Sequence, residues 1–164
     1  MEEKKYRRAI RNPYTRYQGY NCFACAPDNS HGLKMEFYEE GDQVCCEWSP
    51  QPHFQGYKNV LHGGIQATLM DELASWLIQV KLKTGGVTTT MTQKFLKPVF
   101  INNGNILLKA SVKEIRKRNV EVKVDLFDAT GALCSEGLVT YLIFPEEYAR
   151  KALYYPGYES FFQD

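Results

Sequence analysis

The sequence predicts an α+β fold in which one antiparallel β-sheet of about five to six strands wraps around a single long central helix. Apolar residues recur every three or four positions between Gly63 and Lys83, a stretch without proline, and this is the period of an amphipathic helix. Segments with the composition and alternation of β-strands lie on both sides of this stretch. Short turns join several of them, so consecutive strands are expected to pair antiparallel. A single curved sheet would bury such a helix.

The predicted helix is apolar over most of its surface. Its periodic positions are Ile65, Leu69, Leu73, Trp76, Leu77 and Val80, and Ala67, Met70 and Ala74 widen the same face. A helix with so broad an apolar surface is mostly buried. It is expected to end at Thr84-Gly85-Gly86, because glycine accepts the left-handed conformation common at helix C-termini.

Six segments are predicted to form strands. They are residues 33–38, 43–48, 87–100, 106–115, 120–127 and 132–144. Asn102-Asn103-Gly104-Asn105 marks the turn between the third and fourth segments, and Asp128-Ala129-Thr130-Gly131 marks the turn between the fifth and sixth. Gly41-Asp42 marks a hairpin between the first two. Alternation is cleanest in residues 120–127, where every second residue is valine or leucine.

Length and composition predict one domain spanning residues 1–164, with a core at about residues 21–144. A basic segment precedes this core, and an aromatic tail follows it that is expected to pack on the body or on a partner subunit. The formal net charge of +1 provides no basic field for nucleic acid. The sequence has no apolar run long enough for a membrane span, and its charged N-terminus does not resemble a signal peptide. With an odd number of cysteines, five, reduced thiols in the cytoplasm are expected.

The segment most informative about chemistry is the start of the helix. Gly63 and Gly64 open it, and N–H groups in a first helical turn lack intrahelical partners. Such donors, with the positive end of the helix dipole, suit the oxyanion that forms when a thioester carbonyl is attacked. Asp71 follows Gly64 by about two turns on the same face, and a carboxylate on a buried helix needs a partner or a role. Ordinary loop-to-helix packing, a surface Asp71 and a His62 that hydrogen-bonds its neighbours remain alternatives.

The run His62-Gly63-Gly64, with Asp71 nine residues after the histidine, resembles the phenylacetate-pathway-type acyl-CoA thioesterases of the hotdog superfamily. The stretch 87–99, which ends Phe95-Leu96-Lys97-Pro98-Val99, resembles the strand after the helix in that family. The segment 21–33, with Cys22 and Cys25, resembles the N-terminal segment of a subset of these proteins. The resemblance spans about residues 21–144 and implies a hotdog fold and thioester hydrolysis.

The resemblance also implies a role for each matching residue. Asp71 would be the general base or nucleophile, and Gly63 or Gly64 would supply the backbone N–H that polarises the thioester carbonyl. His62 would shape the site, and Thr88, or Thr90 on the same strand face, would orient water. Gln55, or as second choice Asn59, would correspond to the family's amide residue before the histidine. The implied assembly is a homodimer, possibly a homotetramer as a dimer of dimers, whose active site combines the helix start of one subunit with the carboxylate of the other.

The resemblance implies an acyl-CoA substrate and no cofactor. Two other functions stay open, a non-catalytic acyl-CoA-binding module and, ranked third, a hydratase or dehydratase. Cys22-x-x-Cys25 has the spacing of half a zinc site or of a redox pair. No second pair is spaced to complete a zinc site, so no metal is expected and the thiols are interpreted as packing inward. Candidates for the phosphates of coenzyme A are the basic N-terminus, Lys94, Lys97, Arg116, Lys117 and Arg118.

Overall fold

The computed structural model describes residues 6–162. The long apolar stretch forms helix α1 (Gly63–Lys81). The helix begins where the Nδ1 atom of His62 accepts a hydrogen bond of 2.9 Å from the Gly64 N–H and so caps the first turn. It ends two residues earlier than expected, and the left-handed residue at its end is Lys83, with φ of 54°, rather than a glycine. Gly86 instead allows β4 to approach the neighbouring strand closely, because a Cβ there would lie 2.7 Å from the Leu142 carbonyl oxygen.

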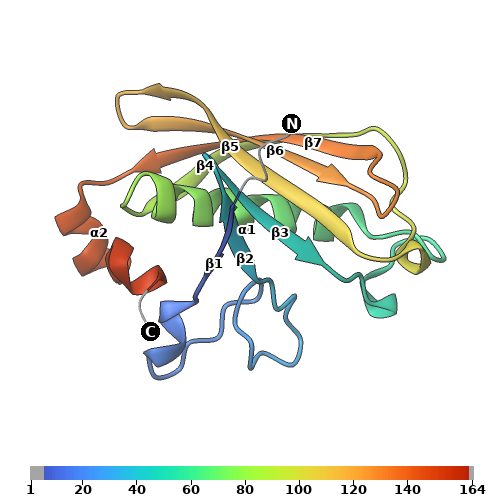
Figure 1. Cartoon of the computed structure of the whole chain (residues 1–164), viewed down its shortest axis with the longest axis horizontal. Helices are drawn as coiled ribbons and strands as arrows, with labels where there is room; N and C mark the ends of the chain where they lie inside the picture. The colour runs from blue at the N-terminus through green and yellow to red at the C-terminus, as the bar shows by residue number, and fades with distance from the viewer. Residues whose placement is uncertain (1–5, 163–164) are drawn as a thin grey trace.

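The described strands form one antiparallel sheet against which α1 packs (Figure 1). They are β1 (Arg7–Ile10), β2 (Phe37–Glu40), β3 (Gln43–Trp48), β4 (Gly86–Phe95), β5 (Ile106–Arg116), β6 (Asn119–Phe127) and β7 (Leu133–Ile143). Their order across the sheet is β1-β2-β3-β5-β6-β7-β4. The α+β class and the helix held by a curved sheet are therefore confirmed. The strand that the sequence did not indicate is β1, which brings the number within residues 6–162 to seven.

The position of β4 departs from the expectation that consecutive strands pair. β4 hydrogen-bonds to β7 and lies at an edge of the sheet, whereas β5 pairs with β3 and β6. The chain after Phe95 therefore crosses the sheet before β5 begins, and Gly104, with φ of 112°, belongs to that connection rather than to a hairpin. The other expected hairpins, β2–β3, β5–β6 and β6–β7, are present.

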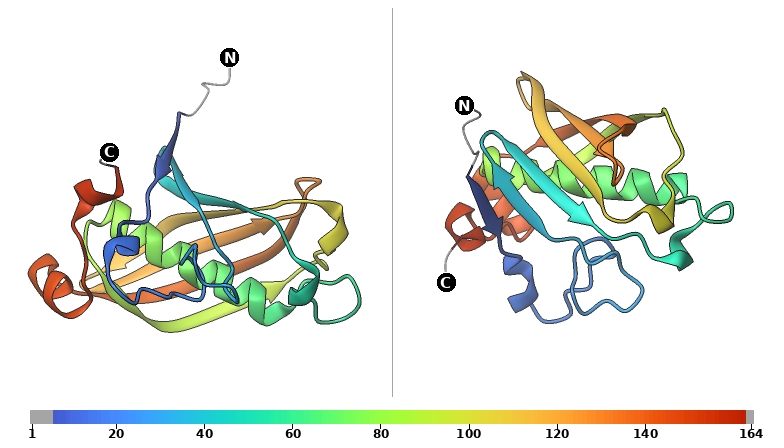
Figure 2. Two further views of the ribbon diagram at one scale, coloured as in Figure 1. Left: turned by 90° about the horizontal axis from the view of Figure 1, so that it is seen from below. Right: turned by 45° about the vertical axis from the view of Figure 1, so that its right-hand side comes forward.

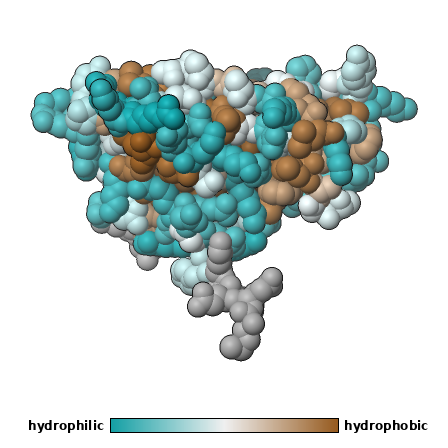
Figure 3. All heavy atoms as spheres, turned by 90° about the horizontal axis from the view of Figure 1, so that it is seen from above, coloured by the Kyte–Doolittle hydropathy of each residue, from teal (hydrophilic) through white to brown (hydrophobic). Residues whose placement is uncertain are grey.

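The core lies between the inner face of the sheet and α1. Val120, Val122, Val124 and Leu126 of β6 are all fully buried, as their alternation predicted. Each side chain of this kind contributes roughly 1.5–3 kcal/mol of apolar burial. The opposite face carries exposed ion pairs such as Lys113–Glu121, and it appears as a mostly hydrophilic surface with separate apolar patches (Figure 3).

The segment between β1 and β2 and the tail after β7 both pack on the side of α1 away from the sheet. The segment between β1 and β2 crosses the helix there (Figure 2), and the Tyr14 hydroxyl donates to Gln79 Oε1 at 2.5 Å. In the tail, Phe161 is fully buried with its ring 5.5 Å from that of Trp76. The prediction that the aromatic tail packs on the body is confirmed for Phe161 and Tyr155, although Tyr154 is exposed.

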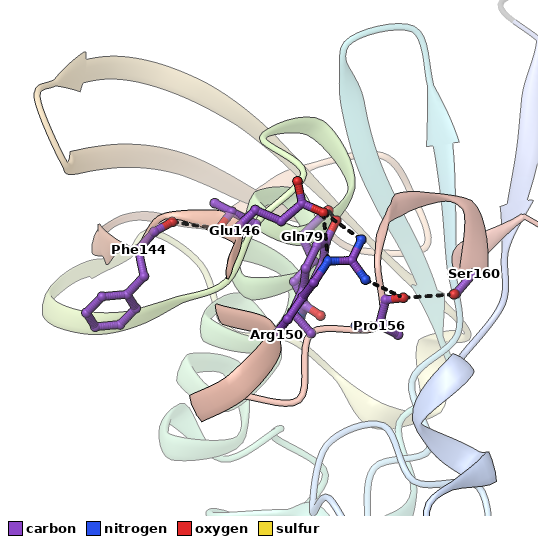
Figure 4. A network of polar contacts seen from close by, with 8 residues as sticks. Gln79, Phe144, Glu146, Arg150, Pro156 and Ser160 are labelled. Carbon is purple, nitrogen blue, oxygen red and sulfur yellow. Dashed lines mark hydrogen bonds and ion pairs between the residues drawn. The ribbon is translucent and has the colours of Figure 1, made fainter. Parts of the chain in front are cut away.

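A second helix, the short α2 (Glu146–Ala152), begins this tail and was not predicted. Figure 4 shows Arg150 on α2 binding Glu146 and the Pro156 carbonyl oxygen, which also accepts a bond from Ser160. These bonds hold the tail in the turn that returns it to α1. Lys4 and Lys5, part of the basic N-terminal segment, lie outside the described residues. Within residues 6–162, no helix is both long and apolar enough to cross a membrane.

Candidate active site

The carboxylate of Asp71 lies where α1 faces the edge of the sheet. Thr88 of β4 donates a hydrogen bond of 2.7 Å from its hydroxyl to Asp71 Oδ1. The Tyr141 hydroxyl of β7 lies 3.2 Å from the same oxygen and 3.0 Å from the Asp71 carbonyl oxygen. Thr88 and Tyr141 lie directly opposite each other on β4 and β7, so a single pair of facing residues provides both hydroxyl groups near Asp71. Within the described part of the chain, Asp71 Oδ2 has no hydrogen-bond partner.

Tyr141 is a residue that sequence reasoning missed. Burial raises the pKa of its hydroxyl, and the nearby charge of Asp71 raises it further. The hydroxyl therefore stays protonated at neutral pH and serves as a donor. No local signal marked it, because its partner lies 70 positions away in the chain.

The start of α1 presents a different set of groups. The Gly64 N–H is bonded to the His62 side chain, and the Ile65 N–H donates to the His62 carbonyl oxygen. The Gly63 N–H has no hydrogen-bond partner among residues 6–162. A Cβ on Gly63 would lie 3.2 Å from the ring of Phe95, which is on β4. The sequence left Gly63 and Gly64 as alternatives, and the free donor is that of Gly63.

One chain does not bring Asp71 and Gly63 together. Eight residues of an α-helix span about 12 Å along its axis. The sequence indicated that the glycine pair and Asp71 share a helix face. At this distance, however, the Asp71 carboxylate and the free Gly63 N–H still lie on separate parts of the surface. The two groups are nevertheless both beside β4, at its Thr88 end and its Phe95 end.

The two amide candidates occupy distinct positions. Gln55 is exposed beside the helix start and, with His62, Gly64 and other residues, lines an open pocket of about 420 Å³. Its Oε1 atom accepts a bond of 3.0 Å from the Asn59 N–H. Asn59 has a left-handed φ of 63° and exchanges two hydrogen bonds with Asn102. Gln55 thus borders the helix start, whereas Asn59 shapes the loop before it.

Thr90 does not share the face of Thr88. A bulge between the two residues shifts the register, so that Thr88 lies opposite Tyr141 and Thr90 opposite Thr140. Tyr141 points to the inner face, and Thr140 lies on the outer face. The expectation of a common face is therefore wrong, because one additional residue reverses the alternation. Thr90 points away from Asp71.

A cluster that could hold a metal ion lies on another face of α1, at Glu72. Ligand atoms of Cys22, Cys25 and Glu72 all lie within 4.8 Å of one another. This cluster contacts neither Thr88 nor the helix start, and its chemistry is considered separately below.

The sheet wrapped around α1, with a carboxylate and a glycine N–H on that helix, defines a hotdog-fold protein with a candidate thioester site. Residues 58–135, a segment that contains α1 and most of the candidate residues, match the family model of the thioesterase superfamily. No curated protein matches the chain.

Solved structures show the same fold. A thioesterase superfamily protein aligns with a TM-score of 0.68 at 16% identity, covering 74% of this chain and 59% of its own length. This chain therefore spans less than two thirds of that relative. Zebrafish thioesterase superfamily member 2 aligns with a TM-score of 0.61 at 26% identity, covering 71% of this chain and 89% of that one. A thioesterase from Haemophilus influenzae gives a TM-score of 0.63 at 19% identity, with 68% and 79% covered.

Proposed function

We propose that the protein hydrolyses acyl-CoA thioesters to free acid and coenzyme A, as a homodimer of the phenylacetate-pathway type. The observation that carries the proposal is the Asp71 carboxylate, which is held through Oδ1 by Thr88 and Tyr141 while Oδ2 has no partner in residues 6–162. A carboxylate fixed through one oxygen presents the other to a water molecule or to a carbonyl carbon. The match of residues 58–135 to the family model of the thioesterase superfamily supports the same chemistry.

The separation of Asp71 from Gly63 favours a dimer. β4 is an edge strand of ten residues, and large apolar side chains near its ends are exposed, namely Val87, Phe95 and Leu96. A long edge strand with exposed apolar side chains at its ends invites pairing with a second copy. If two β4 strands pair antiparallel about a two-fold axis, the Thr88 end of one meets the Phe95 end of the other. Asp71 of one subunit would then face the Gly63 N–H of its partner.

The proposed reaction uses these groups in order. The Gly63 N–H donates to the thioester carbonyl oxygen and stabilises the negative charge that develops there. As general base, Asp71 takes a proton from water, and the hydroxide adds to the carbonyl carbon. The tetrahedral intermediate then collapses, the carbon–sulfur bond breaks, and coenzyme A leaves as a thiolate that is protonated. As nucleophile, Asp71 would form an anhydride that water hydrolyses to the same products.

The experiment is thiol release from a panel of acyl-CoAs by wild type, Asp71→Asn and Asp42→Asn. Asp42 lies in the exposed β2–β3 turn and is a matched control for the same chemical change. We expect Asp71→Asn to lose at least about a hundredfold in turnover and Asp42→Asn to keep it. Near-normal turnover of Asp71→Asn would overturn the assignment. Tight binding of an acyl-CoA with no release of thiol would instead establish the binding-module alternative.

A further inference from the structure

The loop that contains Cys22 and Cys25 meets α1 at Glu72. Neighbouring residues of a helix point about 100° apart, so Asp71 faces the sheet edge while Glu72 faces this loop. The sulfur of Cys22 lies 3.8 Å from Glu72 Oε1, and all three ligand atoms lie within 4.8 Å of one another. The sequence offered no partner for the cysteine pair, and the tertiary structure supplies a carboxylate from a helix some 50 residues away.

These distances suit a tetrahedral metal site. With zinc–sulfur bonds of about 2.3 Å and zinc–oxygen bonds of about 2.0 Å, tetrahedral ligand atoms are separated by roughly 3.5–3.8 Å. For sulfur and oxygen the separation is about 3.5 Å, and the observed distance of 3.8 Å between Cys22 Sγ and Glu72 Oε1 is close to it. Thiolate ligands favour zinc over the harder divalent cations. The Tyr20 hydroxyl lies 2.9 Å from the Cys25 sulfur, so it or a water molecule is close enough to complete four ligands.

Surrounding groups hold the ligands in place. The Trp76 Nε1–H donates to Glu72 Oε1 at 2.9 Å, which orients the carboxylate, while Oε1 keeps a second lone pair and Oε2 is also available to an ion. Asn12 donates to the Cys25 carbonyl oxygen at 2.8 Å and to the Tyr20 hydroxyl at 3.2 Å. Such outer hydrogen bonds are a common feature of protein metal sites, because they fix the orientation of each ligand.

The ligand groups would carry negative charge once the thiols lose their protons. Thiolates and a carboxylate this close together repel each other, and a divalent cation between them would remove that cost.

We propose that Cys22, Cys25 and Glu72 bind one Zn²⁺ ion per chain, with the Tyr20 hydroxyl or water as the fourth ligand. Binding releases the thiol protons to solvent and changes no oxidation state. The ion ties the loop between β1 and β2 to α1 at the residue next to Asp71. Its role is structural, and the site is independent of the proposed thioester chemistry.

The test is a metal titration of the full-length, fully reduced and chelator-treated protein with Co²⁺ and then Zn²⁺, followed by absorption. We expect one Co²⁺ per chain, a thiolate-to-cobalt charge-transfer band, and displacement by one equivalent of Zn²⁺. Glu72→Gln retains an acceptor for the Trp76 N–H but loses the negative charge of the carboxylate. It should weaken Zn²⁺ binding at least about tenfold, because removing even an outer hydrogen-bond partner of a metal ligand has an effect of that size. Cys22→Ser should lose most of the charge-transfer intensity.

Cys134→Ser is the matched control, because Cys134 is a buried cysteine on β7 outside the cluster. It should bind cobalt as wild type does, and circular dichroism checks that each variant is folded. Absence of the charge-transfer band in folded wild type would overturn the proposal, as would equal losses in Cys134→Ser and Cys22→Ser. A Cys22–Cys25 disulfide that persists in the reduced preparation, detected by a mass lower by two hydrogens, would assign the pair to redox chemistry instead.

Discussion

The hydroxyl of Tyr141 lies 3.2 Å from the carboxylate oxygen Oδ1 of Asp71, joining β7 to α1 across the inner face of the sheet. Thr88 reaches the same oxygen from β4 at 2.7 Å. Two donors from adjacent strands thus determine which carboxylate oxygen is free. The orientation of Asp71 is therefore set by the sheet register rather than by the helix alone.

Tyr141→Phe removes one of these donors and keeps the ring in the core. A hydrogen bond to a charged group contributes about 1.5–3 kcal/mol, so we expect turnover to fall by about tenfold or more. Because Tyr141 positions Asp71, the fall should appear in kcat with little change in KM. Steady-state kinetics on the acyl-CoA hydrolysed best by wild type measure both, and an unchanged kcat would refute this role.

Gly63→Pro removes the single donor proposed to hold the oxyanion. Proline is well tolerated at the first position of a helix, so the fold should persist. We expect kcat to fall by about 10²–10³, the usual cost of losing an oxyanion donor. Gly63→Ala adds a Cβ near Phe95 but keeps the N–H, and it should retain far more activity. Equal losses in the two variants would show that crowding, not the donor, causes the effect.

Subunit complementation tests the shared active site. Asp71→Asn and Gly63→Pro are each expected to be inactive as homodimers. A mixed dimer would contain one site with both groups intact, so an equal mixture that exchanges subunits should regain about a quarter of wild-type activity. Activity is measured after co-expression or after unfolding and refolding together. Mixtures that stay inactive, although mass spectrometry shows mixed dimers, would contradict a site built from two subunits.

Phe161→Ala tests the contribution of the tail. Phe161 is fully buried against Trp76, so truncation should lower the free energy of unfolding by about 3–5 kcal/mol. Tyr154→Ala, at a residue that is 68% exposed in the same tail, should change it little. Urea denaturation followed by tryptophan fluorescence measures both. A similar midpoint for the two variants would mean that the tail contributes little to stability.

The buried Cys46 thiol predicts a loss of stability at alkaline pH. Burial raises its pKa to about 12 from an ordinary value of 9.0. Between these values the unfolded chain releases a proton that the folded chain retains, so the free energy of unfolding falls as pH rises, by up to about 1.4 kcal/mol per pH unit. Cys46→Ala should reduce this slope even though it lowers stability overall. Urea midpoints at pH values on both sides of 9 measure it, and an unchanged slope would exclude Cys46 as a cause.

Much of the fold could be predicted because short-range patterns encode it. Leu69, Leu73 and Trp76 lie on the buried face that their spacing indicates, and the alternating β6 residues are buried as expected. The wrong interpretations came from positions where the pattern is interrupted. The bulge at Thr89 turned Thr90 outward, and the connection after Phe95 placed β4 beside β7 instead of β5.

The candidate site shows the same division. The sequence indicated Asp71, Gly63 and Thr88, whose roles remain predictions, and the structure brings Asp71 and Thr88 into contact. It could not indicate Tyr141, because the residues around Tyr141 form an ordinary strand sequence with no motif that marks a functional tyrosine. Nor could it indicate Glu72 as a partner of Cys22, since the two lie 50 positions apart.

By itself the sequence determined which faces are apolar, where α1 begins, and which polar groups lie on it, because periodicity and capping are local properties of the chain. The tertiary structure alone decided that β4 forms an exposed edge, that Tyr141 and Thr88 bind one oxygen of Asp71, and that the cysteine loop meets Glu72. These contacts depend on strand order and register, which are fixed by burying the whole core at once rather than by any single segment.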